Sequence, residues 1–526
     1  MTDTFITLGG AAAIAVLVAL VARRLNWNAP LLLIVAGAVI GPLPFGPSAP
    51  PNPETILVVV LAPLVFGEAL SSSYLDLRRV RRPVMLLAIG LVVATTAVVG
   101  WVTVAIVAIP LALAFALGAI LAPTDAVAVG SVARKAGLPR YLVSVLEGES
   151  LVNDGSGLTL LKVAVVAAAA GSVTGLQITG YFVLAVVGGV GVGAVGGFLA
   201  SWLLRRSSDV VAVNSFVVVI PFVLYVAAEE IRGSGILAVV VSALVIAHAQ
   251  NAVAAHTGRV QSVTLWKHVT FILQSLAYFL VGLELSSVVG NLMAANTSKV
   301  FLLVPAIVVA LIATRFIFVF AMVALGRAAT QLPKRQALWR GAVVASWAGS
   351  RGPVSALAAF SVPLVYETGQ AVPYRDVILA TTFCVIVVSV VLSMTIAPLA
   401  RALKVSSEDE VEATRRVEAM LARAALDRLS DIEMTLEAAG TPMPMSISNH
   451  LREVAERRLI EDQSDDDELA RGTEGQLLVQ TARAMVRAEQ EEVLRMRSED
   501  GLPDALARKI LRTLDLRDAA LRTEEI

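Results

Sequence analysis

Long apolar stretches make up most of this sequence, and short segments rich in Gly, Pro or basic residues separate them. A helix needs roughly 20 mostly apolar residues to cross the hydrocarbon core of a bilayer. On that measure the sequence predicts an all-α polytopic membrane protein with about 13 transmembrane helices. The expected spans are residues 5–22, 29–46, 54–72, 84–106, 110–131, 141–169, 178–204, 210–228, 234–250, 266–286, 299–326, 338–363 and 376–400.

Basic residues gather in every second connection between these spans. If Arg23 and Arg24 are cytoplasmic, the opposite connections hold only Arg232, Lys299 and Arg375. Because basic residues favour the cytoplasmic side, this predicts an external N-terminus, an odd number of helices and a cytoplasmic C-terminus in the cell membrane. The connections expected to be cytoplasmic hold Arg78, Arg79, Arg81, Arg82, Arg134, Lys135, Arg140, Arg205, Arg206, Arg259, Lys267, Arg327, Lys334, Arg335, Arg340, Arg401 and Lys404.

The last quarter of the chain has a different composition. Residues 1–404 contain 25 Lys/Arg and 14 Asp/Glu, a net charge of +11, whereas residues 405–526 contain 17 and 28, a net charge of −11. We therefore predict a transmembrane domain over 1–404 and a cytoplasmic helical regulatory domain over 405–526, with helices near 407–438, 447–461, 467–498 and 503–523. The acidity of this tail argues against nucleic acid or anionic lipid as its partner.

A few ionisable residues lie inside the predicted spans, where they are costly and usually functional. They are Glu68, Asp125, Glu147, Glu149, Asp154, Lys162, Arg315 and Arg351.

Two predicted spans contain helix breakers beside polar residues. Pro123 precedes Thr124 and Asp125 in the fifth span, and glycines and a proline surround Arg351 in the twelfth. Non-helical backbone at membrane depth is tolerated only where protein or a wet cavity surrounds it. The fifth and twelfth spans are an odd interval of seven apart, so the two segments cross in opposite directions, which is typical of an inverted repeat with paired broken helices. An ordinary proline kink capped by Asp125 is the alternative.

The sixth span carries the densest polar cluster. Helical spacing places Glu147, Ser150 and Asp154 on one face. A hydroxyl one turn from a carboxylate offers hard oxygen ligands to a small cation. Glu149 projects elsewhere, and we expect it to form a buried structural ion pair with Arg315. Glu68 is interpreted as a cation ligand, an acid lining the entrance or a structural residue, and Lys162 receives no role.

These motifs resemble those of the NhaP/NHE-type monovalent cation:proton antiporters, the cation:proton antiporter-1 family, over residues 5–404. The run from Glu149 to Asp154 (ESLVND) is similar to the E-S-L-x-N-D ion-site motif of the family. The runs APTD, ending at Asp125, and GSRG, ending at Gly352, resemble its two broken-helix segments, and residues 492–521 resemble the helical end of bacterial members. Gly67 and the pair Leu392-Ser393 depart from the family pattern.

The resemblance implies a role for each site residue. Asp154 would carry the cation and the proton, and the transported Na⁺ would bind Asp154, Ser150 and the Thr124 carbonyl, with Glu68 as a further ligand. Asp125 and Asn153 would hold the helix crossing, and Glu149 with Arg315 would form the buried pair. Independently of the resemblance, Arg351 could offset the exposed negative helix ends where the two breaks meet. The resemblance also implies a homodimer, and we expect no cofactor and no enzymatic activity.

The expected function is exchange of Na⁺, or K⁺ or Li⁺, for H⁺ in pH and sodium homeostasis. Related electrogenic exchangers resemble this family but carry a second Asp where this chain has the neutral Asn153. One cation per proton is therefore expected. The alternatives are a cation channel, although no repeated carbonyl filter is visible, and a K⁺-selective proton antiporter. A membrane enzyme is disfavoured because the four histidines are scattered.

Overall fold

The computed structural model describes most of the chain as helices. The described residues are 2–25, 27–43, 57–125, 138–170, 175–206, 209–253, 256–294, 299–326, 335–363, 365, 372–405, 408–457, 473–498 and 502–523, and no β-strand occurs among them. The chain divides into two compact units. The first comprises Met1–Ser72, Leu77–Val253 and Val263–Ser406, and the second comprises Ser73–Asp76, Ala254–Ser262 and Ser407–Ile526.

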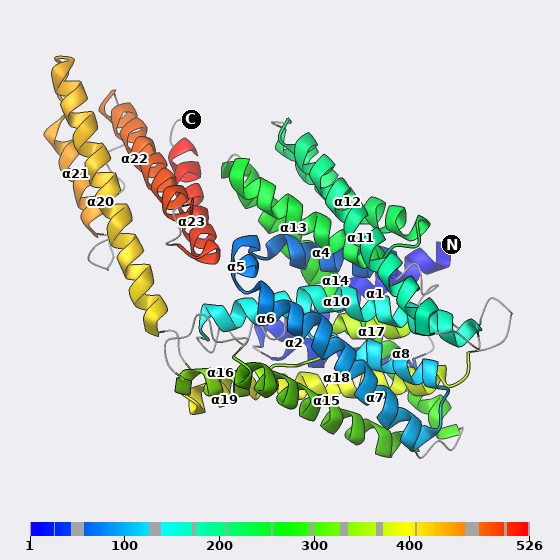
Figure 1. Cartoon of the computed structure of the whole chain (residues 1–526). Helices are drawn as coiled ribbons and strands as arrows, with labels where there is room; N and C mark the ends of the chain where they lie inside the picture. Colours follow the sequence, from blue (N-terminus) through cyan, green and yellow to red (C-terminus); the bar gives the residue numbers. More distant parts are fainter. Residues whose placement is uncertain are drawn as a thin grey trace. The chain divides into compact units, whose positions relative to one another are not determined.

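Helices occupy every span that the apolar pattern predicts in the part of the chain before residue 405 (Figure 1). Two short π-helical segments, η1 and η2, interrupt the third and fourth of these spans. The helices are α1 (Thr2–Arg24), α2 (Ala29–Ile40), η1 (Leu57–Leu61), α4 (Ala62–Ser71), α5 (Tyr74–Arg79), α6 (Arg81–Met85), η2 (Leu86–Leu91), α7 (Val92–Val107), α8 (Leu111–Leu121), α10 (Arg140–Ala170), α11 (Gly175–Leu204), α12 (Val210–Glu230), α13 (Gly235–Val253), α14 (His256–Ala294), α15 (Lys299–Ala324), α16 (Arg335–Trp347), α17 (Pro353–Phe360), α18 (Arg375–Ser393) and α19 (Ile396–Ala402).

Seven stretches among the described residues are both long and apolar enough to cross a membrane. Four further apolar helices, including α2 and α8, are shorter, and the twelfth predicted span is broken into α16 and α17. The helical, membrane-spanning character of the chain is therefore established, whereas the number 13 remains a prediction.

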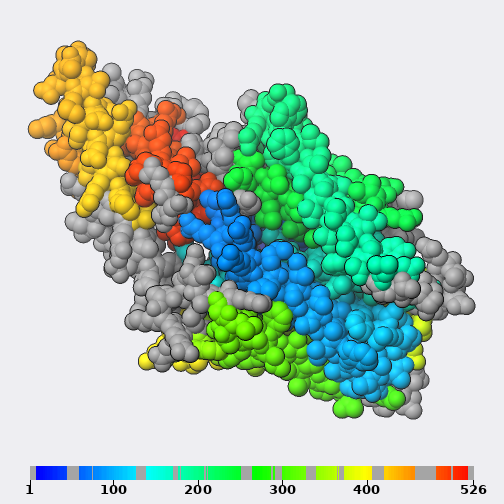
Figure 2. Space-filling view, in the orientation of Figure 1, coloured from blue at the N-terminus to red at the C-terminus, as the bar shows by residue number. Residues whose placement is uncertain are grey.

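The outer surface of the first unit is apolar. Trp101 on α7, Phe198 on α11 and Ile317 on α15 expose 62%, 67% and 71% of their surfaces. Figure 2 shows these three helices at the surface of one face. Soluble proteins rarely expose large apolar side chains so extensively, so these positions are suited to lipid tails.

Glycines on α11 bring it unusually close to α13. A Cβ atom placed on Gly189 would lie 2.6 Å from the Ser234 carbonyl oxygen, and one on Gly193 would lie 2.5 Å from the Ala238 carbonyl oxygen. Such small residues at four-residue spacing allow two membrane helices to pack backbone against backbone. Consequently α11 and α13 form a tightly joined pair.

The two predicted helix interruptions meet inside the first unit. α8 ends at Leu121 before Pro123, and α16 ends at Trp347 before α17 begins at Pro353. The backbone N–H of Asp125 donates to the carbonyl oxygen of Ser350 at 2.8 Å, so the two non-helical segments are directly joined. The predicted continuation of the fifth span beyond Asp125 lies outside the described residues.

The second unit contains four amphipathic helices in the tail: α20 (Glu408–Ala438), α21 (Met445–Arg457), α22 (Thr473–Ser498) and α23 (Asp504–Thr523). α20 packs on α21 and α22, and α22 packs on α23. Asp76, which belongs to this unit, caps α23: its two carboxylate oxygens accept the backbone N–H groups of Asp504 and Ala505 at 3.3 and 3.1 Å. The acidic run at residues 465–468 lies outside the described part of the tail.

Candidate functional site

An acidic pocket lies where the two interrupted helices meet. It is built from α4, α10, the segment after α8 and the start of α17. Among the described residues, its lining contains three carboxylates and no basic side chain. The lining residues are Glu68, Pro123, Thr124, Asp125, Ser150, Asp154, Gly352, Val354 and Ser355.

Thr124 is held in place by three side chains of α10. The Ser150 hydroxyl donates to the Thr124 carbonyl oxygen at 2.5 Å. The Asn153 amide donates to the Thr124 hydroxyl at 3.0 Å, and that hydroxyl donates to Glu149 at 3.4 Å. The non-helical segment after α8 is therefore fixed to α10 by three side chains of that helix.

Asp154 differs from the other two carboxylates of the pocket in its hydrogen bonding. Asp125 accepts from the Tyr278 hydroxyl at 2.8 Å, and Glu68 accepts from the Gln274 amide at 3.3 Å. Asp154 is only 1% exposed, and its Oδ1 atom has no hydrogen-bond partner among the described residues. A buried polar atom without a partner is costly, so this oxygen is suited to a proton or a cation.

The pocket offers oxygen ligands of different kinds, because hydroxyl and carbonyl groups accompany its carboxylates. Within the described part of the chain, no three His, Cys, Asp or Glu side chains are close enough to hold one metal ion. Asp154, the Ser150 hydroxyl and the Thr124 backbone instead present a carboxylate, a hydroxyl and a carbonyl to the same space. Such oxygen groups suit a hard monovalent cation, which unwound backbone commonly helps to coordinate in transporters.

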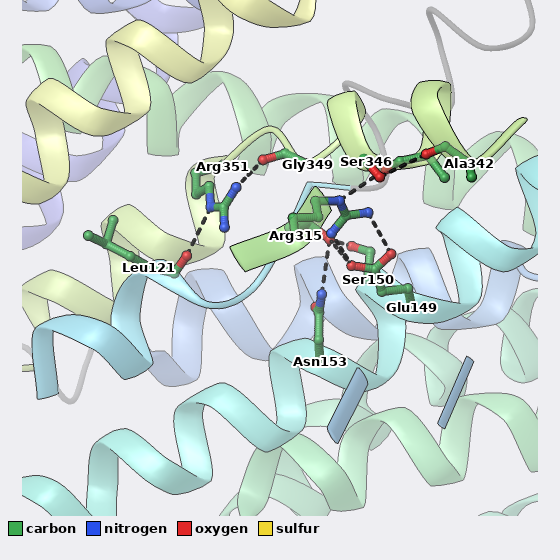
Figure 3. Close-up of polar contacts among 11 residues, drawn as sticks. Leu121, Glu149, Ser150, Asn153, Arg315, Ala342, Ser346, Gly349 and Arg351 are labelled. Carbon is green, nitrogen blue, oxygen red and sulfur yellow. Dashed lines mark hydrogen bonds and ion pairs between the residues drawn. The ribbon is translucent and has the colours of Figure 1, made fainter. Parts of the chain in front are cut away.

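The predicted contact between Glu149 and Arg315 is confirmed. The guanidinium and the carboxylate form two parallel hydrogen bonds, with Arg315 Nη2 at 2.7 Å from Glu149 Oε2, and both residues are at most 2% exposed (Figure 3). Arg315 Nε also donates to the Ala345 carbonyl oxygen at 3.0 Å. The ion pair joins α10 to α15, and the bond to Ala345 joins α15 to α16.

Arg351 contacts the ends of both interrupted helices. Its Nε atom donates to the Leu121 carbonyl oxygen at 2.9 Å, and Nη1 donates to the Gly349 carbonyl oxygen (Figure 3). Carbonyl groups at helix C-termini carry partial negative charge that a cation stabilises. In these contacts the buried Arg351 donates to two backbone carbonyl oxygens and not to a carboxylate.

Two residues on α14 were missing from the predicted site. Gln274 and Tyr278 are one helical turn apart and donate to Glu68 and Asp125, respectively. The sequence signal that could have identified them is a pair of polar side chains four residues apart in an apolar span. Glu147, which shares the predicted face with Asp154, does not line the pocket.

The chain is similar to known proteins over most of its length. The family model described as sodium/hydrogen exchanger, transmembrane, matches residues 12–402. The chain is 30% identical over 510 residues to an uncharacterized Na(+)/H(+) exchanger of Mycobacterium tuberculosis (strain ATCC 25618 / H37Rv), covering 95% of this chain and 93% of that protein. It is 34% identical over 383 residues to the sodium, potassium, lithium and rubidium/H(+) antiporter of Bacillus pumilus (strain SAFR-032), covering 70% of this chain and 57% of that one.

The fold also matches a solved structure. The sodium proton antiporter MjNhaP1 from Methanocaldococcus jannaschii at pH 8 superposes with a TM-score of 0.60 and 18% sequence identity, covering 76% of this chain and 99% of that chain. At this identity the match shows the fold alone. The family match over most of the chain shows more: this membrane protein belongs to the sodium/hydrogen exchangers, a family of cation:proton antiporters.

Proposed function

We propose that the protein exchanges Na⁺, or K⁺ or Li⁺, for H⁺ one to one across the cell membrane, by alternating access, in pH and sodium homeostasis. Asp154 carries the cation and the proton in turn. Ser150 and the Thr124 carbonyl complete the cation site, and Glu68 is a further ligand. We expect no cofactor, and the exchanged ions are the only small partners.

The single observation that carries this proposal is the unpartnered Oδ1 atom of Asp154 inside the acidic pocket. A buried carboxylate is costly as a bare anion and is neutralised either by a proton or by a cation. Proton and cation then compete for one oxygen. A carrier whose single binding group faces each side in turn has to exchange one for the other.

The remaining polar residues support the site rather than carry the ion. Asn153 holds Thr124, Asp125 joins the two non-helical segments through its backbone, and Arg351 neutralises the helix ends. Because Asn153 cannot ionise, the charge of one bound cation equals that of one bound proton, which favours an electroneutral cycle.

The proposed arrangement in the membrane follows the distribution of basic residues. The N-terminus is external and residues 405–526 form a cytoplasmic regulatory domain. Family likeness further suggests a homodimer in the cell membrane.

The decisive experiment is flux through the purified full-length chain in liposomes. A pH gradient is imposed, internal pH is followed with a trapped dye, and Na⁺, K⁺ or Li⁺ is added outside. We expect cation-dependent proton movement in the wild type and none in Asp154→Asn, which keeps the shape but cannot ionise. Asp209→Asn is the matched control, because Asp209 caps α12 at an exposed position and Asn caps equally well.

Two results would contradict the proposal. Normal exchange by a well-folded Asp154→Asn protein would remove Asp154 from the carrier role. Cation current without proton counter-movement would indicate a cation channel, which is the alternative function for the same acidic pocket. The relative rates with Na⁺, K⁺ and Li⁺ test the other alternative, a K⁺-selective antiporter.

A further inference from the structure

The half of α10 that follows Asp154 contacts a second helix group through a regular row of residues. Gly155, Thr159 and Lys162 repeat at spacings of four and three, so they lie on one face of α10. Their partners are Leu237, Ser234 and Glu229, at the start of α13 and the end of α12. We call these three paired positions the α10 seam.

Each pair in the α10 seam is a close contact. A Cβ atom on Gly155 would lie 2.3 Å from a Leu237 methyl carbon, so only glycine fits without a shift. The Thr159 and Ser234 hydroxyl oxygens are 3.1 Å apart, and both residues are at most 5% exposed. Lys162 Nζ lies 2.5 Å from Glu229 Oε2 at the end of the row.

The far side of the seam belongs to a firmly packed group. The Ser234 backbone N–H donates to the Ala185 carbonyl oxygen of α11 at 2.8 Å. Glu229 Oε1 accepts the Gly235 backbone N–H at 3.1 Å, which ties the end of α12 to the start of α13. Together with the glycine contacts between α11 and α13, these bonds make α11–α13 one body against which α10 lies.

The near side belongs to the other body. α10 packs along α8, and the buried Glu149–Arg315 pair joins it to α15 and α16. Asp154 directly precedes Gly155, so the α10 seam begins beside the ion-carrying residue and extends along α10 away from Arg140. Under the proposed orientation this is the external half of the helix.

We propose that the α10 seam is the external gate of the exchanger. It is closed in this structure and separates in each cycle to let the Asp154 pocket reach the outside. The inference rests on the proposed function, because only an alternating-access carrier needs such a gate. It assigns a function to Lys162 and Glu229, neither of which lines the acidic pocket.

The chemistry of the two ion pairs on α10 fits this division. Glu149–Arg315 is buried on both sides, and separating it would leave unsolvated charges. Lys162 and Glu229 are 44% and 34% exposed, so water can replace each partner as the pair separates. The first pair is suited to a permanent contact and the second to a contact that opens repeatedly.

The test is a reversible cross-link across the seam. Thr159→Cys and Ser234→Cys are combined in a Cys384→Ser background, because Cys384 is the only native cysteine. The 3.1 Å separation of the native hydroxyl oxygens is compatible with a disulfide at these positions. The matched controls are the two single-cysteine proteins under the same oxidation. Mass spectrometry verifies bond formation before flux is measured in liposomes.

We expect the oxidised double-cysteine protein to lose exchange to the level of Asp154→Asn, and reduction to restore it. Exchange at the reduced rate by a fully cross-linked protein would overturn the gate. The Cys384→Ser protein, in which the seam is intact, separates this failure from that of the proposed function: if it exchanges no cation for protons, the function itself is wrong.

A second measurement does not depend on the cross-link. The single cysteine at position 159 is labelled with a membrane-impermeant thiol reagent added outside, with and without Lys162→Met or Glu229→Gln. Because either change weakens the closed gate, we expect severalfold faster labelling. An unchanged labelling rate in both variants would show that the ion pair does not hold the seam closed.

Discussion

Replacing one partner of the buried Glu149–Arg315 pair should destabilise the protein far more than replacing both partners. Glu149→Leu leaves Arg315 without its buried partner at 2% exposure, and Arg315→Met leaves Glu149 without its partner at 1% exposure. Losing one partner of a buried pair typically costs about 3–5 kcal/mol, because the remaining charge stays unsolvated. The two single losses would then sum to roughly 6–10 kcal/mol.

The double variant removes both charges together. It loses the contact from the Thr124 hydroxyl to Glu149 and the bond from Arg315 Nε to the Ala345 carbonyl. Each hydrogen bond contributes about 0.5–1.5 kcal/mol net, so we expect a loss of about 1–3 kcal/mol from these two bonds. Since replacing a buried pair by apolar residues is often neutral, the coupling between the two positions should be several kcal/mol.

The assay is a double-mutant cycle on the free energy of unfolding, measured by SDS titration of the purified protein in mixed micelles. A matched control is the exposed pair Glu433–Arg452 in the tail, 3.1 Å apart with side chains 26% and 46% exposed. Such surface pairs typically contribute about 0–1 kcal/mol. Single variants that unfold like the wild type, or a double loss equal to the sum of the single losses, would refute the reasoning.

Three further predictions concern stoichiometry and the tail. Clamping the membrane potential should leave the wild-type exchange rate unchanged, because the exchange is expected to be electroneutral. The informative comparison is Asn153→Asp, which adds a second titratable group beside Asp154. A wild-type rate that follows the potential would contradict electroneutral exchange. Truncation after Lys404 keeps every residue of the acidic pocket, so a well-folded truncated protein should still exchange, with a shifted pH profile; complete loss of flux at every pH would make the tail part of the transport machinery. Asp76→Ala removes the cap of α23 and should cost about 0.5–2 kcal/mol there, seen as faster amide exchange in the first turn of α23, with the exposed Asp431→Ala as the control.

The helix interruptions and the buried pair could be predicted because the sequence leaves few alternatives there. Pro123 and Gly349 stand in apolar runs that would otherwise continue as helix. Arg315 is a single cation in the middle of another such run, so it requires a buried anion, and Glu149 was the acid that the Asp154 face left unused. Charge and helix breaking are rare in a membrane span, which makes each occurrence informative.

The contacts made by Tyr278 and Glu229 could not be predicted in the same way. Tyr278 reaches Asp125 across 153 positions of the chain, and Glu229 reaches Lys162 across 67. Helical periodicity shows which residues share a face, but it does not show which other helix covers that face. The structure supplies that information, for example in the close approach of Gly189 and Gly193 on α11 to α13.

The three carboxylates of the pocket differ in what their surroundings leave free. Asp125 and Glu68 each accept a hydrogen bond from α14, and the Asp125 backbone also holds the two non-helical segments together. A carboxylate occupied in this way loses a hydrogen bond whenever it takes up a proton at the bonded oxygen. Asp154 keeps an oxygen without a protein partner, so binding a proton or a cation there breaks no described hydrogen bond. The α14 donors therefore set Asp125 and Glu68 apart from Asp154, and under the proposed function they favour Asp154 as the exchanging carboxylate.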